Sequence, residues 1–476
     1  MIPYSYHTFL LPFEYSGTIL PDSGFCAEKT MTATAIPAGK KYVADYAAFQ
    51  YFTPEARSLL FGAKHDYCYP PEKLENEAYI IEKQEGKGRP AKTFSLPVTR
   101  VRVLLQDNGV GLFMLSVENR DYPEINDIAW INEYGRRISL PYLTDAPHEV
   151  AAEKISLFGK CADFVKLSEE YISTGHTPNG DIIEPVRAAI EDLLGTEGTI
   201  KPIIDDRMFV CCLIRNEALS ATFKDDGLYT SEDVYRLAFV DADDASCPGE
   251  RMRREILERC IYDRWAPWGT VDVVTHHSIF RLTGEYEGIM NSVINPFNEM
   301  YVQLAAGALL QRASIMYFSN KCAQLSRKIN NALNSKKGIT AQLKREIEKL
   351  NAEFADAGSC IFLDQLSAQE QGMEEFDMLR RELYVDTSLE RLSEKVKGVY
   401  DLAHIYTEQE ENNMLNFITY LGIPLAAAEL VRSVAAAAVP DAGAWWHVAW
   451  AIIGAAAGVL ICTLAKPIVH NIKNRD

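Results

Sequence analysis

The predicted fold depends most on two apolar stretches near the C-terminus: FITYLGIPLAAAELVRSVAAAAV, residues 417–439, and WWHVAWAIIGAAAGVLICTLAKPI, residues 445–468. A helix needs about 20 predominantly apolar residues to cross a bilayer, and each stretch has that length. Only the turn Pro-Asp-Ala-Gly at residues 440–443 separates them. The sequence therefore predicts a hairpin of two transmembrane helices.

The charges around the hairpin predict its orientation. Lys466 at the end of the second stretch and Lys473 and Arg475 after it are basic, whereas the connecting turn has no basic residue and contains Asp441. Basic residues favour the cytoplasmic side of a membrane protein. The first residues show no basic segment followed by an apolar core, which a signal peptide would have. We therefore expect a bacterial inner-membrane protein with both termini in the cytoplasm.

Length and charge limit the remaining possibilities. A chain of 476 residues is longer than one hydrophobic core supports, so it should form at least two folding units. The formal net charge of -18 argues against a nucleic-acid partner, because binding to phosphates needs a basic surface. The 10 cysteines have no C-x-x-C spacing that would indicate zinc or a redox pair.

The first 300 residues have the pattern of a mixed α/β domain, which we interpret as a cytoplasmic sensor. Asp107-Asn108-Gly109 between two β-rich runs is a strong hairpin signal. The predicted strands are residues 98–105, 110–117, 208–214, 234–240 and 270–282. The predicted helices are residues 151–172, 183–194 and 250–262.

Residues 301–415 are predicted to form long helices. Residues 301–334 and 340–354 are separated by a short turn, which predicts an antiparallel pair, and residues 361–416 run toward the first apolar stretch without a proline. Within this third region an apolar stripe has the spacing of a coiled coil: Leu389, Leu392, Val396, Val399 and Ala403. Such a stripe predicts a stalk that packs against copies of itself; the alternative is a helix packed on its own domain. Residues 416–476 complete the chain as the hairpin and a short tail.

This order of elements resembles the CorA family of divalent-cation channels. The local similarity is best at VYDL, residues 399–402, and at NNMLNFITYLGIPL, residues 412–425, and it extends from about Tyr301 to the end. The resemblance implies a CorA-like fold, with an α/β cytoplasmic domain, long stalk helices and a C-terminal two-helix transmembrane hairpin. It also implies a homopentamer in a lipid bilayer. The family's Gly-Met-Asn signature is absent, and Ser433-Val434-Ala435 stands at about its position, so the support for magnesium as the transported ion is weak.

A polar stripe on the first stretch is the predicted pore lining. Asn412, Asn416, Thr419 and Ile423 recur at intervals that place them on one side of a helix. Polar residues in an apolar helix are expected to face water or another helix. By resemblance this side is the pore, with Ile423 as a constriction. Hydrogen bonds between helices, without a pore, are the alternative.

Two further features of the stretches concern charge and packing. Glu429 and Arg432 are three residues apart, so copies of the helix would form charged rings that select ions. The alternative is that Arg432 reaches the outer headgroups. In the second stretch Gly454 and Gly458 form a G-x-x-x-G motif, which permits close helix approach.

Arginines provide the candidate ligand site. The one dense basic cluster of this acidic chain consists of Arg251, Arg253, Arg254, Arg259 and Arg264, and Arg136-Arg137 is a second candidate. Arginine forks suit phosphate groups, so a small nucleotide is the predicted ligand. A solvated helix face is the alternative. Asp241, Asp243 and Asp244 could hold a divalent cation such as Mg²⁺ through their oxygen atoms, but an ordinary loop beside Pro248-Gly249 is the favoured alternative, so the metal is left unassigned.

The predicted function follows from the resemblance and from missing motifs. The sequence has no serine–histidine–carboxylate pattern, P-loop or G-x-G-x-x-G, so we do not expect an enzyme or a required cofactor. Some CorA-like proteins accompany type III CRISPR systems and respond to a conjugate of S-adenosylmethionine with AMP. We therefore predict an ion channel of antiviral defence, gated by its cytoplasmic domain. A housekeeping magnesium transporter and a non-conducting membrane-anchored scaffold are the alternatives. The sequence does not specify the transported ion or the contact residues of the ligand.

Overall fold

The computed structural model describes residues 2–17, 50–61, 66–85, 90–139, 151–174, 182–195, 198–222, 226–334, 340–417, 423–438, 445–446 and 448–459. The chain divides into two compact units. Unit 1 comprises Met1–Lys321 and Ala352–Glu394, and unit 2 comprises Cys322–Asn351 and Lys395–Asp476. The predicted domain limits near residues 300 and 415 stay predictions.

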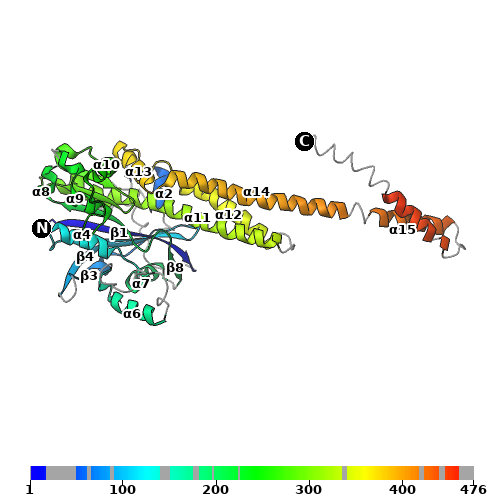
Figure 1. Ribbon diagram of the computed structural model, residues 1–476, viewed down its shortest axis with the longest axis horizontal. Helices are drawn as coiled ribbons and strands as arrows, with labels where there is room; N and C mark the ends of the chain where they lie inside the picture. Colours follow the sequence, from blue (N-terminus) through cyan, green and yellow to red (C-terminus); the bar gives the residue numbers. More distant parts are fainter. Residues whose placement is uncertain are drawn as a thin grey trace. The chain divides into compact units, whose positions relative to one another are not determined.

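Unit 1 is built on a 12-stranded mixed sheet in the order β10-β11-β12-β9-β1-β5-β4-β3-β6-β7, with β2 beside β4 and β8 beside β1 (Figure 1). Among the described pairs β9 and β12 are parallel and the others are antiparallel. The strands are β1 (Ser5–Ser16), β2 (Asp66–Cys68), β3 (Ala78–Gln84), β4 (Ala91–Leu105), β5 (Val110–Asn119), β6 (Lys154–Leu157), β7 (Lys160–Asp163), β8 (Thr199–Pro202), β9 (Phe209–Arg215), β10 (Ile261–Tyr262), β11 (Thr270–Val274) and β12 (Ser278–Thr283).

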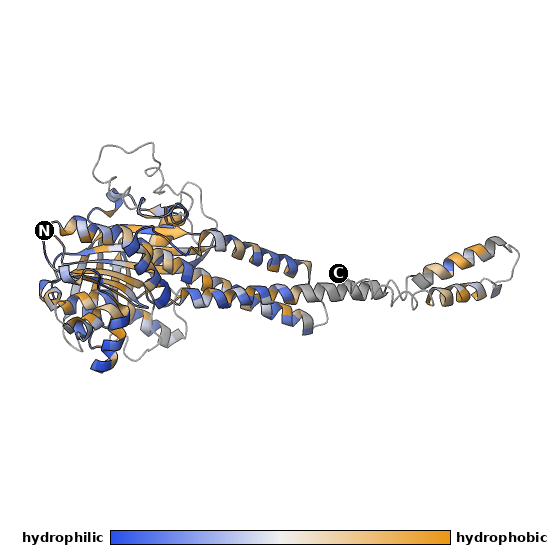
Figure 2. Ribbon diagram, turned by 90° about the horizontal axis from the view of Figure 1, so that it is seen from above, coloured by the Kyte–Doolittle hydropathy of each residue, from blue (hydrophilic) through white to orange (hydrophobic). Residues whose placement is uncertain are grey.

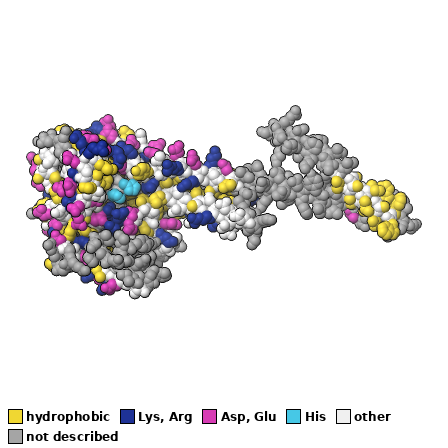
Figure 3. All heavy atoms as spheres, viewed as in Figure 1, with side chains coloured by type: hydrophobic (Ala, Val, Ile, Leu, Met, Phe, Trp, Pro, Cys, Tyr) yellow, Lys and Arg dark blue, Asp and Glu magenta, His cyan; other side chains and the backbone are white. Residues whose placement is uncertain are grey.

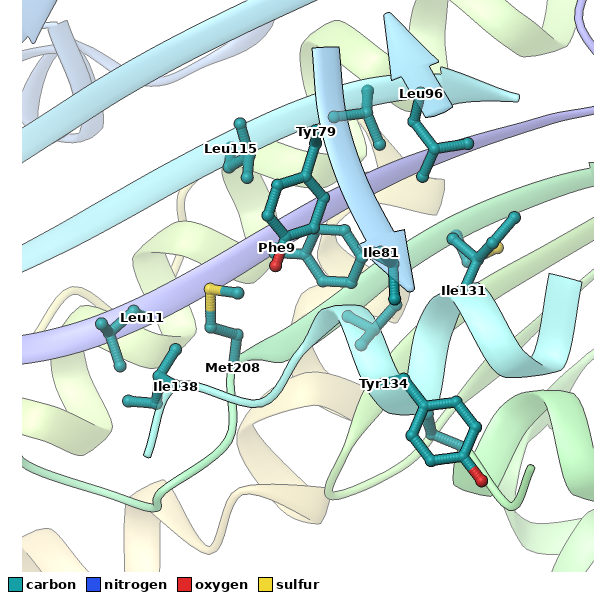
Figure 4. Close-up of a cluster of buried hydrophobic side chains, with 14 of the residues drawn as sticks. Phe9, Leu11, Tyr79, Ile81, Leu96, Leu115, Ile131, Tyr134, Ile138 and Met208 are labelled. Carbon is teal, nitrogen blue, oxygen red and sulfur yellow. The ribbon is translucent and has the colours of Figure 1, made fainter. Parts of the chain in front are cut away.

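Both faces of the central strands are covered. Every residue of β1 from Ser5 to Phe13 is buried, as expected for a strand between two layers. On one face Phe9 packs in the main core with α4 (Ile125–Gly135), where Tyr79 lies at a ring distance of 5.8 Å and donates a hydrogen bond to the Gly135 carbonyl (Figure 4). The opposite face contacts helix α11 (Val302–Asn334) through the Arg102–Gln303 hydrogen bond of 2.9 Å.

The remaining short helices of unit 1 surround this sheet. They are α2 (Pro54–Phe61), α3 (Pro71–Leu74), α6 (Phe164–Thr174), α7 (Glu184–Leu194), α8 (Glu217–Ala221), α9 (Glu232–Phe239), α10 (Glu250–Cys260) and α13 (Glu370–Glu382). The predicted helices at 183–194 and 250–262 are confirmed as α7 and α10. The predicted β4–β5 hairpin is also confirmed: Gly109 has φ +87° in its turn, and Asn108 Oδ1 accepts a hydrogen bond from the Val110 amide.

Four sequence predictions of secondary structure are wrong in part or in full. Residues 234–240 form helix α9, because Val234, Leu237 and Ala238 have helical spacing toward the core and Ser231 provides a side-chain N-cap. Residues 270–282 form two strands rather than one, with His276 in the turn between them. Residues 361–416 contain a break between α13 and α14 (Val385–Phe417).

The fourth error concerns residues 151–172, where a helix was expected. Lys154–Leu157 and Lys160–Asp163 instead form the hairpin β6–β7, and only the following residues are helical, as α6. Phe158 and Gly159 both have positive φ, which is the backbone of a two-residue hairpin turn. Ile155 and Leu157 alternate with polar residues and are buried, so the true period was that of a strand.

Helices α11, α12 (Ala341–Cys360) and α14 run lengthwise together (Figure 1, Figure 2). Lys321 pairs with Glu353 at 2.9 Å and Lys328 with Glu346 at 2.6 Å, an order that makes α11 and α12 antiparallel. Thr340 caps α12 through its hydroxyl, which accepts a hydrogen bond from the Leu343 amide. The turn predicted after residue 334 lies outside the described residues.

The predicted transmembrane hairpin is wrong. Over the described ranges no helix is both long and apolar enough to cross a bilayer. The first stretch contains α15 (Ile423–Ala438), whose 16 residues span about 24 Å against a hydrocarbon core of about 30 Å, and it carries Glu429 and Arg432. This finding contradicts the predicted fold class with its transmembrane hairpin, the predicted membrane ion channel with its membrane-bound alternatives, and the predicted inner-membrane location.

Candidate functional site

The predicted pore stripe does not lie on one described helix. Asn412 and Asn416 belong to α14, which ends at Phe417, whereas Ile423 begins α15. Thr419 lies outside the described residues. Glu429 is exposed on α15. Their assignment as pore lining depended on the membrane channel and is withdrawn with it.

Arg253 of the predicted ligand cluster has a structural role. Its side chain is buried, its Nε donates to the Thr230 carbonyl at 3.0 Å, and its Nη1 donates to the Cys247 carbonyl at 3.1 Å. These bonds connect α10 with the loops on either side of α9. The guanidinium thereby provides hydrogen bonds to backbone carbonyl groups that would otherwise lack a partner.

The other two arginines of α10 that were predicted to bind ligand are paired on its outer surface. Arg251 lies 3.5 Å from Glu255, and Arg254 donates to Glu258 at 2.8 Å. Both pairs have the i, i+4 spacing of ordinary helix-surface ion pairs, which contribute little to stability. Figure 3 shows basic and acidic side chains intermixed over the globular part. These contacts do not favour the predicted nucleotide site, which stays a prediction.

Arg136 and Arg137 form a compact, charge-balanced network at the end of α4. Both bond Glu133, at 2.5 and 2.6 Å, and Arg137 lies beside Arg207 in an isolated β-bridge. Burial, together with the neighbouring Asp205, raises the pKa of Asp206 in the same network to about 6. The three arginines thus meet three acidic groups, and no unbalanced positive charge remains for an anion. The network connects α4 to the start of β9.

The arrangement closest to catalytic geometry was missed at the sequence level. Asn119 Nδ2 donates to Ser5 Oγ at 2.9 Å, Ser5 Oγ lies 2.8 Å from His7 Nε2, and His7 Nδ1 donates to Asn132 Oδ1 at 2.7 Å. This is the order of a nucleophile, base and orienting group. Ser5 and His7 are two residues apart on β1 and so share a face, which is the only sequence signal for it.

Access to this array excludes catalysis. Ser5 is 0% exposed, and His7 and Asn132 are 1% exposed. A substrate therefore cannot reach the Ser5 hydroxyl oxygen. Burial lowers the pKa of His7 from 6.5 to about 4, so the imidazole is neutral at physiological pH. We interpret the array as a buried polar network, in which Asn132 Nδ2 is left without a hydrogen-bond partner among the described atoms.

Unit 2 shows an inverted distribution of apolar side chains in α15 and in the helical residues 445–446 and 448–459, which together we call the C-terminal helix pair. At Gly454 an added Cβ would stand 2.7 Å from the Ala427 carbonyl oxygen and 2.9 Å from Val431 Cβ, so the missing side chain of Gly454 lets the two helices approach closely. The large side chains point outward: Leu430 is 65% and Ile452 64% exposed. Val434, Trp445, Trp446, Val448, Ile453 and Val459 are exposed as well.

Neither metal ligands nor similarity to known proteins identifies a function for this chain. Over the described ranges, no group of three or more histidine, cysteine or acidic side chains could hold a metal ion. No protein-family model matches the sequence, and no curated protein matches it. The resemblance to the CorA family therefore stays a prediction.

Proposed function

We propose that the chain is a non-catalytic protein that self-associates through its C-terminal helix pair. The observation that carries this proposal is the distribution just described: Gly454 packs against Ala427, Ala428 and Val431 within the pair, whereas large apolar side chains such as Leu430, Ile452 and Ile453 are exposed. Exposed apolar patches mark interaction sites, because water exposure of such side chains is unfavourable. The outward face is suited to contact the same face of another copy.

The energies involved are adequate for a specific assembly. Full burial of one leucine, isoleucine or valine side chain contributes about 1.5–3 kcal/mol. Leu430, Val434, Ile452 and Ile453 would together contribute several kcal/mol per copy, before the loss of translational and side-chain freedom is subtracted. The resemblance of residues 301–476 to a family of homopentamers supports an assembly of the same kind.

The test measures the mass of the purified full chain by light scattering and sedimentation velocity. We expect a discrete oligomer, and the double variant Leu430→Glu with Ile453→Glu should shift it to monomer. Met252→Glu is the matched control, because Met252 is a similarly exposed apolar residue in unit 1, on α10. This control should keep the oligomer.

Three outcomes would overturn the proposal. A wild-type chain that stays monomeric at every concentration has no self-association to explain. An oligomer that survives the double variant but not Met252→Glu assembles through unit 1. A monomeric chain that floats with phospholipid vesicles in a density gradient, and loses this binding in the double variant, uses the helix pair for a lipid occupant.

A further inference from the structure

Helix α13 is held against the strands at one edge of the sheet by contacts near both of its ends. Arg264, just after β10, reaches Glu374 at 2.6 Å. Arg259 on α10 lies 3.5 Å from Glu382, and His276 Nδ1, in the turn between β11 and β12, donates to the Glu382 carbonyl at 3.0 Å. The Arg264 and Arg259 side chains are exposed, although Glu382 is buried, and ion pairs with an exposed partner contribute little.

The middle of α13 makes a different contact, in the interior. Glu375 Oε1 lies 3.4 Å from Arg281 Nη2 on β12, and the same nitrogen donates to Asp272 Oδ2 on β11 at 2.6 Å. Arg281 Nε also bonds Asp272, so this pair is bidentate. Glu375 and Asp272 are 0% exposed and Arg281 is 2% exposed. One buried guanidinium thus serves two buried carboxyl groups, and Asp272 has the better geometry.

Among the described residues, Arg281 is the cation that pairs with Glu375. Its Oε2 is buried without a hydrogen-bond partner among the described atoms. Besides Asp272 and Arg281, the titratable groups that act on it are Glu374 on its own helix and the phenols of Tyr51, Tyr262 and Tyr301. Burial, with Asp272 in support, raises the pKa of Glu375 well above its usual range.

Two aromatic rings next to Arg281 connect this buried cluster to the start of α11. The guanidinium lies 4.1 Å from the ring centre of Tyr301 and 5.2 Å from that of Phe297. Both rings come from the π-helical turn Phe297–Tyr301, which leads directly into α11. π-helical turns are rare and often occur at functional positions. The same cluster therefore joins the sheet, α13 and the start of α11.

We propose that α13 is a releasable strap, which stays on the sheet while the Glu375 carboxyl is neutral and detaches when that carboxyl is ionised. A neutral carboxyl can share Arg281 with Asp272 without adding buried charge. An ionised one adds a second buried negative charge beside Asp272, with one guanidinium for both, and this is strongly unfavourable.

Release of α13 would directly affect how α14 is anchored. Only Leu383 and Tyr384 separate the two helices, and Tyr384 has φ +54°. Arg380 on α13 bonds Asp386 in the first turn of α14. Movement of α13 therefore alters the anchoring of α14 at its N-terminal end. The inference is independent of self-association, since all of these residues belong to unit 1.

Hydrogen exchange of the full chain tests the strap. After correction for the intrinsic exchange rate, we expect peptides covering residues 370–394 to exchange at least about fivefold faster at about pH 8 than at about pH 6. Glu375→Gln keeps the size of the side chain and removes the ionisation. It should exchange more slowly than wild type at the higher pH and lose the pH difference. Asp377→Asn, which removes an exposed carboxylate on the same helix, is the matched control and should behave as wild type.

The direction in which Glu375→Gln changes the exchange rate of residues 370–394 distinguishes a neutral Glu375 from an ionised one. If this variant exchanges faster in residues 370–394, or does not fold, Glu375 acts as an ionised partner that Arg281 requires, and the strap is wrong. A wild-type chain with no pH difference after correction, or a pH difference that persists in Glu375→Gln, also overturns it.

Discussion

The buried imidazole of His7 makes a prediction about acid stability that can be worked out from the structure. Its pKa is lowered from 6.5 to about 4 because burial disfavours the charged form. The unfolded chain therefore binds a proton before the folded chain does. Stability from this group is fully present above pH 6.5, and it is lost as the pH falls from there toward 4. Lowering the pH from about 7 to about 5 should remove roughly 2 kcal/mol through this side chain alone.

Comparison with His7→Gln isolates this contribution. Urea unfolding at both pH values gives the loss of unfolding free energy for each protein, and acidic groups such as Asp206 contribute equally to both. The loss should be about 2 kcal/mol smaller in His7→Gln, although that variant is less stable at neutral pH. Ser5→Ala is the control: it removes the partner of Nε2 but keeps the imidazole, so it should retain the wild-type pH dependence. The reasoning is refuted if His7→Gln and wild type lose equal stability, or if NMR shows His7 titrating near 6.5 in the folded chain.

Three further predictions concern local strain, buried charge and helix packing. Tyr384→Gly should raise the unfolding free energy by up to about 1 kcal/mol in urea titration, because φ +54° is strained for tyrosine and the side chain is mostly exposed; a loss would show that its ring contacts matter more. Arg102→Met should lower it by about 3–5 kcal/mol, since Asp66 would be left buried and unpaired, and adding Asp66→Leu should restore much of the loss; no recovery would contradict this account. Gly454→Val should open the C-terminal helix pair, because its Cβ would collide with backbone of α15, and limited proteolysis should then cut residues 423–459 faster than in wild type; unchanged cleavage would mean that the helices separate freely already.

Elements that are specified locally could be predicted from the sequence. The β4–β5 hairpin depends on Gly109, whose positive φ few other residues adopt, and this signal is contained in three consecutive residues. Helix α9 was missed because its buried valine and aromatic residues suit a strand equally well; its hydroxyl cap at Ser231 decides for the helix. Hairpin β6–β7 was missed because the helical periodicity of residues 151–172 hides the short alternation of Ile155 and Leu157, which is the period of a strand.

The charged centres could not be predicted, because they depend on pairing between distant segments. Arg281 meets Asp272 only because β11 and β12 pair in a register that places them opposite each other. Glu375 joins them from a helix 94 residues later in the chain. The α10 arginines show the opposite problem, because residues that are close in the sequence do not form one site. Their density in the sequence suggested one site, but the helix turns Arg253 into the interior and leaves Arg251 and Arg254 on its outer face, and the structure gives each a separate partner.

The stripe on α14 shows why a hydrophobic repeat alone does not identify a partner. Leu392, Val396, Val399 and Ala403 are buried within the single chain, so the alternative of packing on the chain's own helices accounts for them. A second copy cannot use a face that is already covered. The repeat therefore gives no support to self-association through α14, whose exposed side carries Tyr400 and Leu402 instead. The C-terminal helix pair differs, because its large apolar side chains have no cover within the described part of the chain. If copies of this protein assemble, that pair is where contacts between them should form, and cross-links between copies should concentrate on residues 423–459 rather than on residues 392–403.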